Sequence, residues 1–163
     1  MTQTFQVIIE ISPITGQVKY EYKNGILQVD RFLSTPMFYP CNYGFIPDSL
    51  GGDGDPLDIL LKSSHPLLPG CQIEARAIGA LVTEDEAGED LKILALPLAK
   101  VDPALAAFHN YQDLPEIFLK QIEHFFTHYK DLEKGKWVKV KNWIGPEEVF
   151  GVISKSLLKN KNN

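Results

Sequence analysis

The chain is short of cysteine, of positive charge and of long hydrophobic runs, and each shortage excludes a class of protein. Its 163 residues contain two cysteines, Cys41 and Cys71, whose spacing fits neither a disulfide framework nor a cysteine metal site. No apolar run is long enough to cross a membrane. The formal charge of −5 argues against broad nucleic-acid affinity, because that affinity comes mainly from basic residues that neutralise phosphates.

We expect no secretory leader from the amino-terminal segment. Its sequence, MTQTFQVIIEISP, has no basic region followed by a small-residue cleavage site. We therefore expect a cytoplasmic protein with both thiols reduced. Hydrophobic residues make up 44% of the chain, enough for a core, and the composition nowhere shifts enough to divide it. We expect a single catalytic domain over residues 1–163.

Strand patterns fill the first two thirds of the chain. The dipeptide Asn24-Gly25 between two β-rich runs is typical of a tight hairpin. An acidic segment, residues 84–90, separates two of the expected strands and should lie at a hairpin end. The sequence predicts strands at Thr4–Ile11, Val18–Tyr22, Ile26–Phe32, Asp58–Leu61, Gln72–Val82 and Leu91–Pro97.

Helical periodicity dominates the final third. Over residues 114–129, apolar side chains recur at three- and four-residue steps, with Asp113 as a candidate cap and Pro115 in the first turn. Residues 137–143 alternate like a strand, and Pro146 opens a second amphipathic helix. Strands followed by helices predict an α+β fold that is mainly β.

Three carboxylates lie within residues 53–58, whose sequence is DGDPLD. Two like charges about 4 Å apart repel by roughly 1 kcal/mol in water and by more near a protein surface, so such a cluster indicates a cation site. Mg²⁺ takes oxygen ligands, keeps several waters and often bridges to substrate phosphates. A solvated Asp/Gly/Pro turn is the alternative, and composition alone favours it.

A second acidic run carries Asp85, Glu86, Glu89 and Asp90. If folding brings it to the first, the two form a bowl for several metal ions; a solvated hairpin tip is the alternative. Basic and phenolic side chains would then bind an anionic phosphate beside the metals, although each could be an ordinary surface residue. The candidates are Lys19, Arg31, Lys92, Tyr129 and Lys130.

Other metal and nucleotide motifs do not fit. His124 and His128 are four residues apart, but Phe125 stands where a zinc-protease motif needs glutamate. The 53–58 turn has Asp58 where a calcium loop requires glycine. No Gly-x-x-x-x-Gly-Lys loop is present.

Four segments carry a resemblance to a known family. They are RFLSTPMFYPCNYG at 31–44, DGDPLD at 53–58, DEAGED at 85–90 and HFFTHYK at 124–130. In this order they resemble the soluble family I inorganic pyrophosphatases of bacteria. The resemblance extends from about Val7 to Trp143, nearly the whole chain. It implies an OB-like, partly closed β-barrel with helices packed outside. It also implies hydrolysis of diphosphate to two orthophosphates by attack of a metal-activated water.

The same resemblance assigns roles to individual residues. Asp55 would act as the general base that accepts the proton of the attacking water. The metal ligands would be Asp53, Asp58, Asp85 and Asp90. The phosphate-binding residues would be Lys19, Arg31, Tyr43, Tyr129 and Lys130. Further polar positions of the family's cavity are matched by Glu10, Glu21, Lys92 and Tyr39.

As cofactor, the resemblance implies several Mg²⁺ ions per active site, and as partners the diphosphate substrate and a homohexamer, with no nucleic acid and no membrane. A noncatalytic module is the alternative function. An oligonucleotide-binding barrel would interleave aromatic and basic residues on one face, whereas acids dominate the loops here. A scaffold without turnover would lack one of the expected metal carboxylates, and all of them are present.

Overall fold

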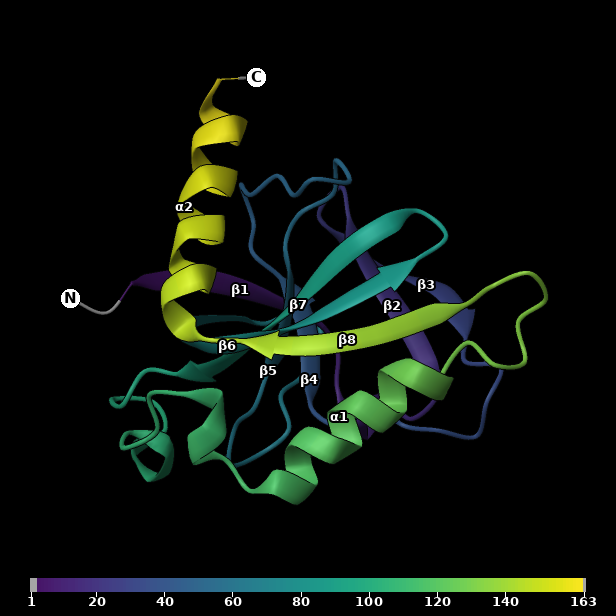
Figure 1. Cartoon of the computed structure of the whole chain (residues 1–163), viewed down its shortest axis with the longest axis horizontal. Helices are drawn as coiled ribbons and strands as arrows, with labels where there is room; N and C mark the ends of the chain where they lie inside the picture. The colour runs from purple at the N-terminus through teal and green to yellow at the C-terminus, as the bar shows by residue number, and fades with distance from the viewer. Residues whose placement is uncertain (1–2, 163) are drawn as a thin grey trace.

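Six strands join in one sheet whose ends meet in the computed structural model, which describes residues 3–162 (Figure 1). The strands are β1 (Thr4–Ile11), β4 (Asn42–Phe45), β5 (Asp58–Leu61), β6 (Gln72–Asp85), β7 (Gly88–Pro97) and β8 (Val138–Ile144). Their order is β1-β4-β5-β7-β6-β8, and β1 also pairs with β6. Five strands therefore form a ring of pairings, which is the OB-like, partly closed barrel. The expected domain, residues 1–163, includes Met1, Thr2 and Asn163, which lie outside the described residues.

A separate hairpin joins β2 (Val18–Lys23) to β3 (Ile26–Phe32). Asn24 and Gly25 form its turn with φ of 54° and 76°, and a tight two-residue hairpin requires such positive values. The pairing shifts near Lys19, which opposes Arg31, while Tyr20 opposes Val29. Asp30 is therefore the extra residue of a β-bulge.

The barrel closes tightly where β1 meets β4. Gly44 opposes Ile9, and a Cβ atom at Gly44 would lie 1.9 Å from the carbonyl oxygen of Ile8. Only glycine fits so close to a neighbouring backbone. This contact fixes β4, whose Tyr43 side chain is buried.

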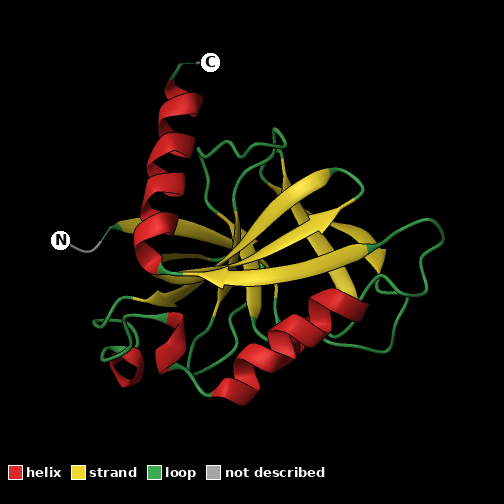
Figure 2. Cartoon of the chain, in the orientation of Figure 1, coloured by secondary structure: helices red, strands yellow, loops and turns green. Residues whose placement is uncertain are grey.

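Two helices pack outside the strands, as Figure 2 shows in red: α1 (Glu116–His128) and α2 (Pro146–Lys161). Short 3₁₀ helices are η1 (Pro13–Thr15), η2 (Pro103–Leu105) and η3 (Tyr111–Asp113). Helix α1 contacts β8, whereas α2 contacts β6. No helix among residues 3–162 is long and apolar enough to cross a bilayer.

Alternation along the strands divides the buried side chains into two cores. In β5, Leu60 belongs to a core that α1 completes with Phe118, Ile122, Phe125 and Phe126, here named the α1-side core. The neighbouring side chains of β5 belong to the other cluster. That α2-side core is completed by Val149 and Ile153 and contains Val7, Ile9, Ile59, Leu61, Ile93 and Ala95.

The mainly β prediction is confirmed, and the predicted bounds of β1, β3 and β5 agree with the structure. Three strand predictions were too short, since β2 ends at Lys23, β6 continues to Asp85 and β7 begins at Gly88. Most of the expected acidic loop is therefore a ladder in which Glu84 opposes Glu89. The ladder persists because Lys141 of β8 bridges both glutamates, at 2.8 and 3.3 Å.

Two further local predictions need correction. Asp113 does not cap α1: its carboxylate accepts the backbone N–H groups of His109 and Asn110, both at 2.9 Å, and so closes η3. Pro115 instead occupies the N-cap position of α1. The short strand β4 was not predicted, because four residues that include a glycine carry little strand signal.

Candidate active site

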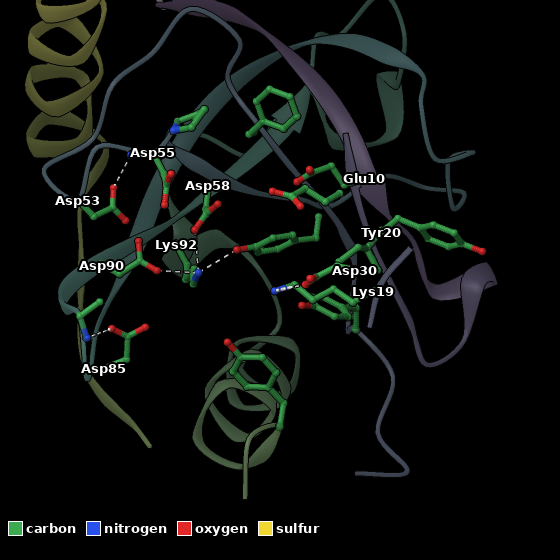
Figure 3. A pocket seen from close by; sticks show the side chains of 18 of the residues that line it. Glu10, Lys19, Tyr20, Asp30, Asp53, Asp55, Asp58, Asp85, Asp90 and Lys92 are labelled. Atoms are coloured by element: carbon green, nitrogen blue, oxygen red, sulfur yellow. Dashed lines mark hydrogen bonds and ion pairs between the residues drawn. The ribbon is translucent and has the colours of Figure 1, made fainter. Parts of the chain in front are cut away.

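A cavity of about 470 Å³ opens beside the α1-side core (Figure 3). Its walls come from segments that are far apart in the sequence: β1, the β2–β3 hairpin, the 53–58 turn, the β6–β7 hairpin and the residues that follow α1. The two acidic segments therefore face one shared space, as the bowl hypothesis requires.

Negative charge is concentrated in this cavity. Nine carboxylates and three lysines line it, a formal charge of −6, whereas the whole chain carries −5. The remainder of the molecule is thus close to neutral. The carboxylates are Glu10, Glu21, Asp30, Asp53, Asp55, Asp58, Asp85, Glu89 and Asp90, and the lysines are Lys19, Lys92 and Lys130.

The 53–58 turn carries three of these carboxylates, and hydrogen bonds hold its first part at the cavity wall (Figure 3). The Asp53 Oδ1 atom accepts the backbone N–H of Asp55 at 3.0 Å, which is an Asx-turn. Below it, the N–H of Gly51 donates to the carbonyl of Asp55 at 2.7 Å, and the N–H of Leu57 donates to the Ser49 hydroxyl at 2.9 Å. The turn is therefore tied down on both sides, so that Asp53 and Asp55 have fixed positions.

Lys92 lies at the junction of the turn and the barrel. Its Nζ atom is 2.8 Å from Asp58 Oδ2, 2.7 Å from Asp90 Oδ2 and 2.8 Å from the Tyr43 hydroxyl. Burial alone would lower the pKa of Lys92, but the carboxylate of Asp58, the Tyr43 oxygen and the carboxylate of Asp90 raise it well above its ordinary value. The side chain is therefore an ammonium.

Some acidic side chains of the β6–β7 hairpin line the cavity and others do not. Asp85 and Asp90 line the cavity, with Asp85 Oδ2 3.7 Å from the ammonium of Lys130. Burial raises the pKa of Asp90, and the Lys92 ammonium opposes that rise. Glu86 lies outside the cavity lining, 3.1 Å from Lys136. Only part of the acidic run can therefore meet a ligand in the cavity.

The β2–β3 hairpin contributes the opposite wall. Lys19 Nζ is 3.4 Å from Asp30 Oδ2, and burial, followed by the nearby Arg31 charge, lowers the pKa of Lys19. Arg31 does not line the cavity; its guanidinium is 3.4 Å from Glu133 and 3.8 Å from Asp30. Asp30 was not predicted, because it is the extra residue of the β-bulge, and regular counting from the Asn24-Gly25 turn does not reveal a bulge.

A wall of aromatic rings supports three phenols. The Tyr39 ring lies 4.5 Å from the Phe125 ring, Phe125 is 5.1 Å from Tyr129, and Phe126 is 5.6 Å from Tyr129. Tyr39, Tyr43 and Tyr129 are buried and line the cavity. Burial raises the pKa of Tyr43 well above its ordinary value, so its hydroxyl keeps its proton.

Glu10 lies on β1 at the edge of the cavity. Its Oε2 atom accepts the backbone N–H of Tyr22 at 2.8 Å. Burial raises the pKa of Glu10 to about 7, against the lowering effect of that hydrogen bond. Glu10 is therefore partly protonated near neutral pH.

The donor set fits a hard divalent cation. Five aspartates, Asp53, Asp55, Asp58, Asp85 and Asp90, present carboxylate oxygens to one cavity. In the part of the chain that the structure describes, no three acid, histidine or cysteine side chains converge closely enough to hold an ion unaided. Carboxylate oxygens are the ligands that hard divalent cations such as Mg²⁺ take, and such ions complete their shell with water and substrate phosphates.

The structure brings together every predicted site residue except Arg31 as lining of this cavity. The rejected histidines lie elsewhere: the His124 and His128 ring centroids are 4.6 Å apart with the rings tilted by 51°, and His128 Nδ1 is 2.7 Å from Asp131 Oδ2. Cys41 is buried, and burial raises its pKa to about 12, so it is an unreactive thiol.

Comparisons with known proteins find relatives in sequence and in structure over most of the chain. The family model described as inorganic pyrophosphatase matches residues 7–161. Inorganic pyrophosphatase of Agrobacterium fabrum is 56% identical over 84% of this chain and 78% of its own length. That of Rickettsia prowazekii is 55% identical over 94% of this chain and 91% of its own. The solved structure of the Coxiella burnetii inorganic pyrophosphatase superposes with a TM-score of 0.94 at 47% identity, over 97% of this chain and 95% of that one.

Proposed function

The chain belongs to the inorganic pyrophosphatase family, and we propose from that premise that it hydrolyses inorganic diphosphate to two orthophosphates. One observation of the structure carries the proposal beyond the family name. Nine carboxylates share one cavity with three lysines and three buried phenols, which is a surface for divalent cations and phosphate together.

We propose that Asp53, Asp58, Asp85 and Asp90 hold Mg²⁺ ions. When bound, these ions neutralise the charge of diphosphate and lower the pKa of the attacking water toward neutrality. The aspartates themselves fix where the ions lie, because the 53–58 turn and the strand ends that carry them are tied to the barrel.

Asp55 is the proposed general base. It lies between Asp53 and Asp58 in the turn and lines the cavity. Its carboxylate takes the proton of the water whose oxygen forms the new bond to phosphorus, as the bond from that phosphorus to the bridging oxygen breaks. One orthophosphate therefore keeps the bridging oxygen, and the other gains the oxygen of water.

The cations and phenols of the opposite wall bind the phosphate oxygens. Lys19, Tyr43, Tyr129 and Lys130 line the cavity and can donate to them. Arg31 has to leave Glu133 to reach the substrate, since its guanidinium now pairs with that carboxylate. These donors stabilise the charge that gathers on the leaving phosphate.

The test is phosphate release from diphosphate by the purified protein, with Mg²⁺ and with excess EDTA. We expect turnover only with Mg²⁺, and much slower phosphate release from ATP and simple phosphomonoesters. A protein that binds diphosphate and Mg²⁺ but releases no phosphate would instead be a noncatalytic scaffold. Equal rates with EDTA would remove the metal from the proposal.

Three further proposals rest on the resemblance to bacterial relatives. The whole chain acts as one catalytic domain, a view that the match over residues 7–161 supports. It assembles as a homohexamer, and it works in the cytoplasm. The native mass in solution checks the second of these.

A further inference from the structure

The Lys92 ammonium lies between two of the proposed metal ligands. Its Nζ atom is 2.8 Å from Asp58 Oδ2 and 2.7 Å from Asp90 Oδ2, and it donates to the Tyr43 hydroxyl at 2.8 Å. An ammonium has three N–H donors, and these three partners match them in number. The protein thus supplies its own cation to this carboxylate pair.

Strand register builds this arrangement into the barrel. Lys92 of β7 opposes Asp58 of the parallel strand β5, and Asp90 lies two residues earlier on the same face of β7. The Lys92 side chain is only 8% exposed, whereas Asp58 and Asp90 are 28% and 23% exposed. The ammonium also lies 5.3 Å from the Tyr43 ring and 5.5 Å from the Phe126 ring, within reach of a cation–π attraction. Lys92 therefore approaches the carboxylates from the core, and their cavity side remains open.

We propose that Lys92 is an internal counter-ion: it holds Asp58 and Asp90 in place before metal binds, and its charge weakens the binding of divalent ions there. The inference rests on the proposed metal site. A positive charge in contact with both carboxylates repels an ion that shares them, and the repulsion is strong at the effective dielectric constant of a protein surface. Weaker binding lets the ions leave with product phosphate.

The experiment replaces the ammonium with an apolar group of similar length. Lys92→Met should bind Mg²⁺ or Mn²⁺ at least about tenfold more tightly than the wild type in calorimetric titrations without diphosphate. Lys130→Met is the matched control, because it removes the same charge from the same cavity. Lys130 lies 3.7 Å from Asp85 and does not bridge two ligands, so we expect less than about a threefold change.

Thermal unfolding in EDTA supplies a second measurement. Without the ammonium, the two partly buried carboxylates repel each other with no opposite charge beside them, so Lys92→Met should lower Tm by about 5–10 °C. Added Mg²⁺ should raise the Tm of the variant by more than it raises the Tm of the wild type. Metal affinity no tighter than that of the wild type, or equal to that of Lys130→Met, would overturn the inference.

If Lys92→Met does not fold, an NMR measurement on the wild-type protein tests the inference instead. Heteronuclear NMR of the lysine ammonium groups should show one slowly exchanging signal in EDTA that shifts as Mg²⁺ binds. A signal that Mg²⁺ leaves unchanged would also overturn the inference. All of these titrations omit diphosphate, so failure of the proposed reaction appears only in the phosphate assay.

Discussion

The α2-side core is closed and apolar, whereas the α1-side core opens into the acidic cavity. Val149 and Ile153 of α2 are fully buried against residues of β1, β5 and β7. On the other side, Tyr39, Tyr43 and Tyr129 belong to the core and to the cavity wall at once. The same strands thus provide stability on one side and chemistry on the other.

Strand β7 shows how one face changes from packing to chemistry. Leu94 and Leu96 are buried in the α1-side core, and Lys92 and Asp90 continue the same alternation into the cavity. Because the leucines fix the strand, the polar side chains beyond them have fixed positions, as a functional site requires. We therefore expect substitutions in the cavity to change turnover but not stability, and substitutions in the α2-side core to change stability but not turnover.

The largest effect is expected at the cavity. Asp55→Asn should lower kcat by about 10²–10⁴-fold, because the amide cannot accept the water's proton, while Mg²⁺ affinity and Tm stay near the wild-type values. Steady-state phosphate release and metal titration check it. Glu84→Gln is the control: this acid of the other acidic segment pairs with Lys141 outside the cavity lining and should leave kcat within about twofold. Near-normal turnover in Asp55→Asn would remove Asp55 from its role.

The opposite separation is expected in the α2-side core. Ile153→Ala should lower the free energy of unfolding by about 2–5 kcal/mol, because a fully buried side chain is replaced by a cavity. Denaturant unfolding measures it, and kcat below the transition should not change. Lys155→Ala, an exposed change two residues along the same helix, should cost less than about 0.5 kcal/mol. Loss of kcat in folded Ile153→Ala would show that the two sides are coupled.

Much of this division could be predicted from the sequence. β-Rich runs and the Asn24-Gly25 turn located β1 and β3, and the short apolar run DILL located β5. The DGDPLD turn and the acidic run line one cavity, as the bowl hypothesis required. These predictions succeed because each signal is local: a run of strand-forming residues, a turn dipeptide and a cluster of like charges.

The failures are long-range or irregular. Asp30 reaches Lys19 while Arg31 turns toward Glu133, because a bulge at Asp30 shifts the register, and a bulge has no marker in this sequence. The position of Lys92 between Asp58 and Asp90 depends on the parallel pairing of β5 with β7. Sequence patterns alone do not specify which strands pair in parallel, so this contact could not be predicted.

The smallest of the predicted effects lies where the two environments meet, at Glu10. Asp58, Glu21 and Lys19 act on its charge, but burial dominates and raises its pKa from 4.5 to about 7. Since the folded pKa is the higher one, the folded state holds this proton more tightly than the unfolded state. The contribution of Glu10 is therefore most favourable below pH 4.5, declines as pH rises to about 7 and is constant above that.

In metal-free protein, the free energy of unfolding of the wild type minus that of Glu10→Gln should fall by at most about 3 kcal/mol between pH 4.5 and 7.5. The glutamine oxygen can still accept the Tyr22 N–H, so the hydrogen bond is kept while the titration is lost. Subtracting the variant cancels groups that titrate alike in both proteins. Urea unfolding in EDTA at several pH values measures this difference in the free energy of unfolding. A difference that does not vary with pH would show that the Glu10 carboxylate is solvated rather than buried at the edge of the cavity.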